Sequence, residues 1–223
     1  MSGAARAETA EHEEGVENAA PAAPRGRTLS LVLAGLVVLI AVAVVAAAAL
    51  RPSVPGPDSP EAGFARDMST HHAQAVQMSF MIRDASDDEK IRTLAYDIIT
   101  TQSAQIGMMT AWLDAWKAPK VDPKGPMRWM SGHGGHGGGS GAAMPGMATD
   151  QQLKELESAE GKDAEVLFLK LMIAHHRGGV EMAEAVLART DREEVERLAR
   201  TMVEGQSAEI ELMTSMLRER GAA

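Results

Sequence analysis

The sequence Phe64-Ala-Arg-Asp-Met68-Ser-Thr-His71-His72-Ala-Gln-Ala-Val76-Gln-Met78 occurs a second time. It returns 104 residues later (168 − 64 = 104) as Phe168-Leu-Lys-Leu-Met172-Ile-Ala-His175-His176-Arg-Gly-Gly-Val180-Glu-Met182. Four of the seven histidines lie in these two copies, each pair between methionines. With the same offset and no gap, residues 64–113 align with 168–217, and 17 of the 50 positions are identical. We infer a helical hairpin that is duplicated in tandem.

The composition of the chain favours an all-α fold. The 223 residues are enough for one domain with appendages, and aromatic residues make up only 3%. A net charge of −9 argues against nucleic acid as a partner. There is no cysteine, so disulfides and thiolate metal sites are excluded, and the soft metal ligands available are the thioethers of 15 methionines.

The N-terminal part predicts a single membrane-spanning helix. Residues 1–28 are typical of a disordered cytoplasmic tail, and residues 29–51 of a transmembrane anchor. Its uncharged core, residues 31–50, has about the 20 residues needed to cross a lipid bilayer. Arg25 and Arg27 precede it, which places the N-terminus in the cytoplasm and the bulk of the chain outside. The alternative is a cleaved signal peptide and a secreted product, because the apolar run ends in small residues.

Residues 52–58 form a linker, and residues 59–221 are expected to form a bundle of four long helices. Repeat one covers 59–117, a flexible crossover rich in Gly, Met and His covers 118–148, and repeat two covers 149–221. Capping boxes are expected to open helices at Ser86, Thr149 and Thr190, each with Glu or Gln three residues later. Two hairpins joined by one long crossover predict ferritin-like connectivity.

The helical period places both histidines of each pair on the apolar face of their helix. Met68 and Met78 share that face, and Met109 and Gln102 of the next helix are expected to lie opposite; the second repeat places its counterparts in the same relation. Buried imidazoles need hydrogen-bond partners, and the candidates nearby are Gln102, Gln105, Gln206 and Glu209. A single buried His or Met is ordinarily a core residue. Imidazole and thioether together, repeated, favour a metal site for copper, especially Cu(I).

The crossover carries a second group of soft ligands on a glycine-rich segment: Met130, His133, His136, Met144 and Met147. Five such residues within 18 positions are more than a solvated linker requires. We expect a weaker copper site here, because ordering a flexible segment costs conformational entropy.

The repeated pattern, followed by Gln102-Ser-Ala-Gln105-Ile and Gln206-Ser-Ala-Glu209-Ile, resembles the bacterial domain-of-unknown-function family 305. The resemblance covers about residues 63–217 and implies a ferritin-like fold. It also implies extracytoplasmic copper binding, as in the CopM-type members of that family. The ligands that it implies are Met68, His71, His72, Met78 and Met109, with Met172, His175, His176, Met182 and Met213. This chain departs from equal repeats at Gly178-Gly179, which replaces Gln74-Ala75 and indicates a close approach of another helix.

We therefore predict a membrane-tethered protein that sequesters or passes on copper and is not an enzyme. A ferritin-like di-metal oxidase is the first alternative, but it requires Glu-x-x-His motifs, and the sequence has none. A structural or sensory bundle without metal is the second. No nucleophile, base or phosphate-loop pattern indicates hydrolytic or nucleotide chemistry, and no protein partner is indicated.

Overall fold

The computed structural model describes residues 25–49, 53–130 and 144–222. These described residues form helices and connecting segments without a strand, which confirms the predicted all-α class. The helices are α1 (Arg25–Ala49), α2 (Pro60–Ala85), α3 (Glu89–Ala115), α4 (Asp150–Ser158), α5 (Gly161–Leu187) and α6 (Glu193–Glu219), with a short 3-10 helix η1 (Arg128–Met130). The chain divides into two units, residues 1–53 and 54–223.

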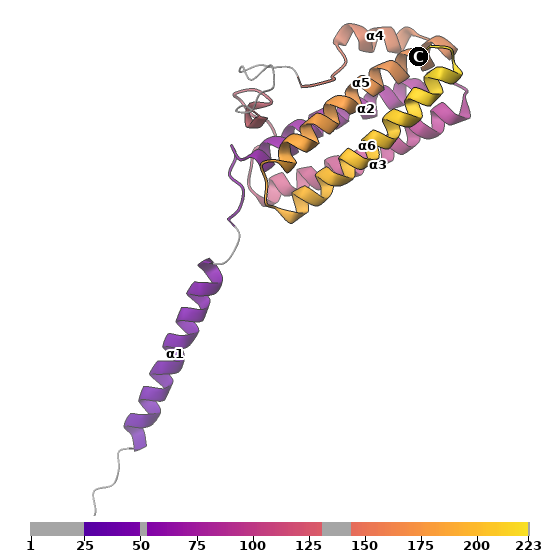
Figure 1. The fold of residues 1–223 in the computed structure, drawn as a ribbon. Helices are drawn as coiled ribbons and strands as arrows, with labels where there is room; N and C mark the ends of the chain where they lie inside the picture. Colours follow the sequence, from indigo (N-terminus) through magenta and orange to yellow (C-terminus); the bar gives the residue numbers. More distant parts are fainter. Residues whose placement is uncertain (1–24, 50–52, 131–143, 223) are drawn as a thin grey trace, which may run out of the picture. The chain divides into compact units, whose positions relative to one another are not determined.

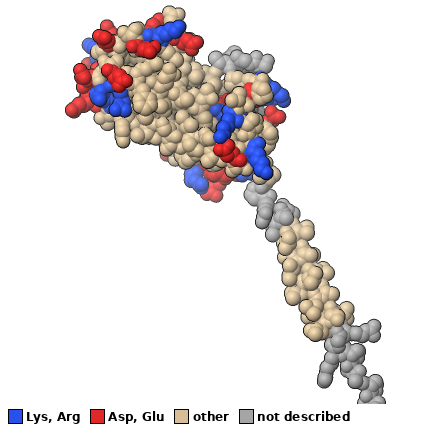
Figure 2. Space-filling model, turned by 180° about the vertical axis from the view of Figure 1, so that it is seen from behind, with Lys and Arg blue, Asp and Glu red and all other residues tan. Residues whose placement is uncertain are grey.

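The first unit consists of α1, and Leu29–Ala46 is long and apolar enough to cross a membrane. Its Leu, Val and Ile side chains are exposed, and Figure 2 shows no charged side chain along the described part of its surface. The helix begins at Arg25, inside the expected tail, because a helix once formed extends at little further cost. The rest of that tail, residues 1–24, lies outside the described residues. Anchor and signal peptide both stay predictions.

The second unit is built from two helical hairpins, α2–α3 and α5–α6, as the duplication predicted (Figure 1). The hairpins meet mainly through α2 and α5, and α4 packs on the same two helices. Ser59 caps the start of α2, with Pro60 as its first residue, where the sequence placed it. The further likeness to ferritins stays a prediction.

Apolar side chains gather in two clusters, one toward each end of the bundle. One cluster holds Phe168, Ile82 and Ile91; the other holds Phe64, Leu113 and Val195. Each of the four long helices contributes to both clusters and passes through the middle of the bundle between them. The middle is therefore the part of the core that apolar packing leaves free for other side chains.

Two of the three predicted capping boxes are wrong. The box at Thr149 is present at the start of α4. However, the carboxylate of Asp88 caps α3, and α6 begins after Arg192 without a side-chain cap. The hydroxyls of Ser86 and Thr190 instead accept the backbone N–H two residues later, at Asp88 and Arg192. They stabilise the turn before the helix and not the first turn of the helix itself.

These two hydroxyls also connect the repeats. Ser86 donates to Glu165 Oε1 over 2.7 Å, and Thr190 donates to Glu61 Oε1 over 2.9 Å. The two glutamates are themselves one repeat apart (165 − 61 = 104), and they lie just before the aligned stretches 64–113 and 168–217. Each hairpin corner thus contacts the first turns of the opposite repeat, as a pseudo-two-fold arrangement requires.

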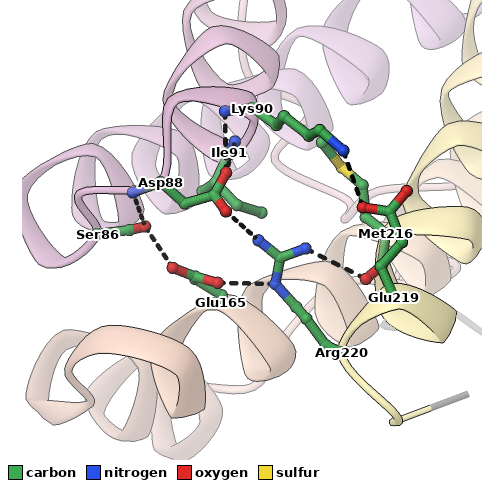
Figure 3. Close-up of polar contacts among 8 residues, drawn as sticks. All are labelled: Ser86, Asp88, Lys90, Ile91, Glu165, Met216, Glu219 and Arg220. Atoms are coloured by element: carbon green, nitrogen blue, oxygen red, sulfur yellow. Dashed lines mark hydrogen bonds and ion pairs between the residues drawn. The ribbon is translucent and has the colours of Figure 1, made fainter.

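Arg220 fixes the C-terminal end of α6 to one of these corners (Figure 3). Its Nε lies 2.7 Å from Glu165 Oε2, and its second terminal nitrogen lies 3.0 Å from Asp88 Oδ2. Nearby, Lys90 pairs with Glu219 over 2.9 Å. The Arg220 and Glu165 side chains are 8% and 11% exposed, whereas Lys90 and Glu219 are 66% and 51% exposed. The same kind of contact should therefore have very different effects on stability.

At the other end of the bundle, Trp116 stands at the position equivalent to Arg220 (220 − 104 = 116), and Arg192 stands at the position equivalent to Asp88 (88 + 104 = 192). There the guanidinium lies over the indole ring, 5.9 Å from its centroid. The two equivalent positions are thus in contact at both ends of the bundle, through an ion pair at one end and a cation–π contact at the other.

We predict that Arg220→Ala lowers the free energy of unfolding of residues 54–223 by about 3 kcal/mol, because it leaves Glu165 nearly buried without a cation. Lys90→Ala, the matched control, should cost less than about 1 kcal/mol, since its pair is exposed to solvent. Urea unfolding at neutral pH measures both. Equal losses in the two variants would contradict this account of the corner.

Candidate metal centre

A layer of buried polar side chains crosses the middle of the bundle between the two apolar clusters. Its members are His71 and His72 of α2, Gln102 of α3, His175 and His176 of α5, and Gln206 of α6. We call the four histidines the histidine layer. Each is at most 1% exposed, which confirms the prediction that both members of each pair face inward.

The two repeats meet at His71 and His175. The ring centroids of these equivalent residues are 3.8 Å apart, with an angle of 32° between the ring planes. The ring of His176 lies 6.3 Å from that of His175. The histidines therefore form one shared group and not two separate sites.

Three of the four imidazoles donate a hydrogen bond through Nε2. His72 donates to Gln105 Oε1 over 2.7 Å, and His176 donates to Glu209 Oε2 over 2.6 Å. His71 donates to the backbone carbonyl of Pro145 over 2.9 Å. Each partner is an oxygen acceptor, so the hydrogen is on Nε2 and a neutral ring carries its lone pair on Nδ1.

Those lone pairs have no partner among the described residues. Nδ1 of all four histidines is buried without a hydrogen bond, and so is Nε2 of His175. The side-chain nitrogen and oxygen of Gln206 are likewise buried without a hydrogen-bond partner. An unsatisfied buried polar atom costs about 1–3 kcal/mol, so the layer weakens the bundle unless something else binds there.

Burial also keeps His71, His72 and His175 neutral at neutral pH. It lowers the pKa of His71 to about 4 and that of His72 to about 3, and the neighbouring histidines add to the shift of His72. The pKa of His175 is held well below its usual value, again chiefly by burial. Neutral imidazole is the form that binds a metal ion, so these three histidines are in their ligating form at neutral pH.

The six methionines implied as ligands are all fully buried and form two trios. The first trio is Met68, Met109 and Met182; the second is Met78, Met172 and Met213. The first belongs to one apolar cluster and the second to the other, on opposite sides of the histidine layer. Each trio draws on both repeats, so Met68 and Met78, which share one face of α2, lie in different clusters. The mixing of the repeats follows from the pseudo-two-fold packing, which runs α5 against α2 in the opposite sense.

The donor set limits which metal the layer fits. Among the residues that the structure describes, no three His, Asp or Glu side chains are placed to hold one ion. A site in the layer therefore has to combine imidazole with other donors, and the buried thioethers lie on both sides. Imidazole with thioether suits Cu(I) better than the harder cations that require carboxylates.

The described parts of the crossover, 118–130 and 144–148, are fixed to the bundle. Asp67 accepts hydrogen bonds from the backbone of Met127 over 2.7 Å and from Trp129 Nε1 over 2.9 Å. Trp129 packs edge-on against Phe64 and fills the space above Gly63, where a Cβ would lie 2.5 Å from the indole. A largely buried indole and a paired carboxylate thus hold residues 127–129 of the crossover, while its glycine-rich residues 131–143 lie outside the described residues.

The structure places three of the five crossover candidates. Met130 and Met144 pack against the apolar cluster that contains the first methionine trio, and Met147 is half-buried. His133 and His136 lie outside the described residues, so the expected site in the crossover stays a prediction.

The returning end of the crossover lies against the histidine layer. Besides the Pro145 carbonyl on His71, the side-chain amide of Gln74 both donates to and accepts from the backbone of Ala148, over 2.9 and 2.7 Å. A Cβ at Gly178 would lie 2.0 Å from the Pro145 oxygen, and one at Gly179 would lie 2.3 Å from an oxygen of Gln206. The two glycines of the second repeat therefore make room for the crossover and for Gln206. The predicted close approach of a helix is confirmed at Gly179, which meets Gln206 of α6, whereas the neighbour of Gly178 is the crossover. Both contacts make the two halves of the layer unequal.

Comparison with known proteins identifies related chains. The family model DUF305, a domain of unknown function, matches residues 61–217. A DUF305 protein from Streptomyces coelicolor that is presumed to be secreted is 53% identical, with a TM-score of 0.69 over 75% of this chain and 97% of that one. A DUF305 fragment from Deinococcus radiodurans is 34% identical, with a TM-score of 0.61 over 74% and 99%.

The chain is also similar to CopM, which has been solved with copper bound. The Cu(I)-bound form is 25% identical, with a TM-score of 0.56 over 72% of this chain and 96% of that one. The Cu(II)-bound form is 30% identical, with a TM-score of 0.54 over 72% and 97%. No curated protein matches the chain.

We predict that metal-free residues 54–223 lose stability as the pH falls below 6.5. Above that value His71 and His72 are largely neutral in both the folded and the unfolded chain. Below it the unfolded chain binds protons that folded His71 and His72 take up only near pH 4 and 3. Each such histidine should lower the free energy of unfolding by up to about 1.4 kcal/mol per pH unit in that window.

Urea unfolding between pH 7.5 and 5 measures this slope, and His72→Gln is the matched variant because its amide can still donate to Gln105. In this variant the slope of the free energy of unfolding against pH should be smaller by about 1.4 kcal/mol per pH unit, because one proton fewer is taken up on unfolding. Identical slopes would mean that His72 is not held neutral by the fold.

Gly178→Ala should destabilise the same unit by more than about 1 kcal/mol, because the new methyl group displaces the Pro145 backbone. Gly205→Ala is the control: it is also inside a helix, but nothing lies within 4 Å of the added Cβ. That change should stabilise by about 0.5–1 kcal/mol. Thermal unfolding compares the two, and a stabilised Gly178→Ala would show that the crossover does not lie against α5.

Proposed function

This chain belongs to the DUF305 family, as its repeated histidine pattern predicted, and on that premise we propose that it binds copper in the histidine layer. The bound metal would be sequestered, or passed on to another molecule, outside the cytoplasmic membrane. Cu(I) is the favoured ion. The candidate ligands are the four histidines, no three of which converge on one ion among the described residues, together with thioethers from the two methionine trios.

The observation that carries this proposal is the state of the imidazoles. In three of them the Nε2 hydrogen is held by a fixed oxygen, which sets the tautomer and turns the Nδ1 lone pair into the buried interior. Second oxygen partners of this kind are a regular feature of metal-ligating histidines. Copper would supply a soft cation that accepts these lone pairs. The protein would orient the donors and keep them away from water.

The likeness to CopM supports copper over other soft metals, since that protein has been solved in Cu(I)-bound and Cu(II)-bound forms. The support from this chain is independent of that likeness. Its layer combines buried imidazoles with flanking thioethers, and Glu209 is the one carboxylate among the described residues that forms an ion-pair contact with a layer histidine.

We propose that the bundle lies outside the cytoplasmic membrane and that α1 tethers it, with the N-terminus in the cytoplasm. The apolar surface of α1 and the secreted character presumed for the Streptomyces coelicolor relative both support an extracytoplasmic location. Nucleic acid is not the proposed partner. The bundle face seen in Figure 2 carries acidic and basic groups side by side, without a continuous basic stripe.

We also propose that the protein binds copper without catalysing a reaction. A di-metal oxidase would need several carboxylates around its ions, and thioethers occupy the equivalent duplicated positions here. A bundle without any metal would leave the Nδ1 lone pairs as a pure loss of stability.

We predict that residues 54–223 bind Cu(I) and that their melting temperature rises with the free copper concentration, as mass action requires for a ligand of the folded state. Competition with a Cu(I) chelator measures the affinity. The double variants His71→Ala/His175→Ala and His72→Ala/His176→Ala should each lose at least about tenfold in affinity, and their ranking identifies which histidine of each pair contributes more.

His133→Ala/His136→Ala serves as the control for the crossover, and metal-free melting temperatures check that every variant folds. Unchanged affinity in both layer variants, with a loss in the crossover variant, would move the site out of the bundle. Unchanged affinity in all three would contradict histidine ligation altogether.

A further inference from the structure

The histidine layer has a built-in electrostatic asymmetry at duplicated positions. His72 and His176 are one repeat apart, and so are their partners Gln105 and Glu209. The two hydrogen bonds have nearly the same length, 2.7 and 2.6 Å, and both run from Nε2 to a side-chain oxygen. One acceptor is a neutral amide and the other a carboxylate. The geometry is thus repeated while the charge is not.

Resting on the copper function proposed above, we propose that Glu209 is a positioning residue that supplies the counter-charge for copper and sets which oxidation state the layer holds. It acts through His176 and does not touch the metal. Gln105 orients His72 in the same way but adds no charge. The half of the layer that contains His176 is accordingly the half that favours the more highly charged ion.

The physical reason is the low polarity of the layer. A cation bound among buried imidazoles and thioethers brings a charge into the core, which is costly without a counter-charge. Glu209 reaches the buried ring from the bundle surface, with its side chain 25% exposed, while His176 is fully buried. Among the described residues, Glu209 forms its ion-pair contact with His176 and forms none with a Lys or Arg that would neutralise its charge. One carboxylate balances the single charge of Cu(I).

The stabilisation by a fixed carboxylate scales with the charge of the ion. Removing the charge should therefore weaken binding of Cu(II) about twice as much, on a logarithmic scale, as binding of Cu(I). A partner of a ligating histidine typically changes metal affinity by about 10–100-fold. We expect Glu209→Gln to lower the affinity for Cu(I) about tenfold and that for Cu(II) about a hundredfold.

The test uses residues 54–223 with Glu209→Gln, Gln105→Glu, and the double variant that exchanges the two groups. Affinities for Cu(I) and Cu(II) are measured against chelators specific to each state, together with the reduction potential of the bound copper. The potential should rise by about 59 mV in Glu209→Gln, which is the tenfold difference between the two losses converted for one electron. Gln105→Glu should shift it in the opposite direction. The double variant should lie close to the original protein, because it keeps one carboxylate at an equivalent position.

A merely structural role would reduce both affinities equally and leave the potential unchanged, and that result would overturn this proposal while leaving copper binding in place. A double variant as impaired as Glu209→Gln would also overturn it. Metal-free melting temperatures separate misfolding from loss of charge. If the original protein binds no copper in the layer, the proposed function fails and this proposal fails with it.

Discussion

A buried neutral imidazole has two ring nitrogens to satisfy, and this bundle satisfies only one in most cases. His71, His72 and His176 each donate through Nε2 to an oxygen, while the Nδ1 lone pairs face the interior without a partner among the described residues. Apolar clusters on both sides show that the same helices pack well without polar groups. The layer therefore lowers the stability of the bundle, by about 1–3 kcal/mol for each unsatisfied atom. A soft cation that accepts the lone pairs would remove that loss, which is why we connect the layer with copper.

The duplication explains how a chain without cysteine brings so many soft donors together. Pseudo-two-fold packing of the hairpins places His71 against His175 and mixes the methionines of the two repeats on either side. The same symmetry holds the ends of the bundle, where Ser86 and Thr190 reach glutamates of the opposite repeat. The symmetry is broken at the ends, where Arg220 pairs with Asp88 but Arg192 lies over Trp116. It is also broken at the layer, where Gly178 admits the returning crossover and Glu209 replaces an amide by a charge. A symmetric framework thus carries an asymmetric site.

Local patterns predicted a large part of this arrangement. The helical period places the histidines inside, and the constant offset predicts the paired hairpins. Gln105 and Glu209 were two of the four polar side chains expected nearby as hydrogen-bond partners. Features that depend on distant segments were not predictable. Ser86 has the sequence of a helix cap, but a glutamate from the other repeat takes its hydroxyl. The Pro145 carbonyl on His71 is a backbone group, which leaves no pattern in the side chains. The grouping of the methionines needed the packing of one repeat against the other, and their role as ligands stays a prediction.

X-ray absorption and anomalous diffraction on copper-loaded residues 54–223 would test the central claim most directly, because they report the ligands and the position of the metal. We predict copper bonded to Nδ1 of layer histidines together with thioether sulfur, between the first and second methionine trios. Copper bonded through Nε2, or found only at the crossover segment, would contradict the assignment of the histidine layer as the metal centre.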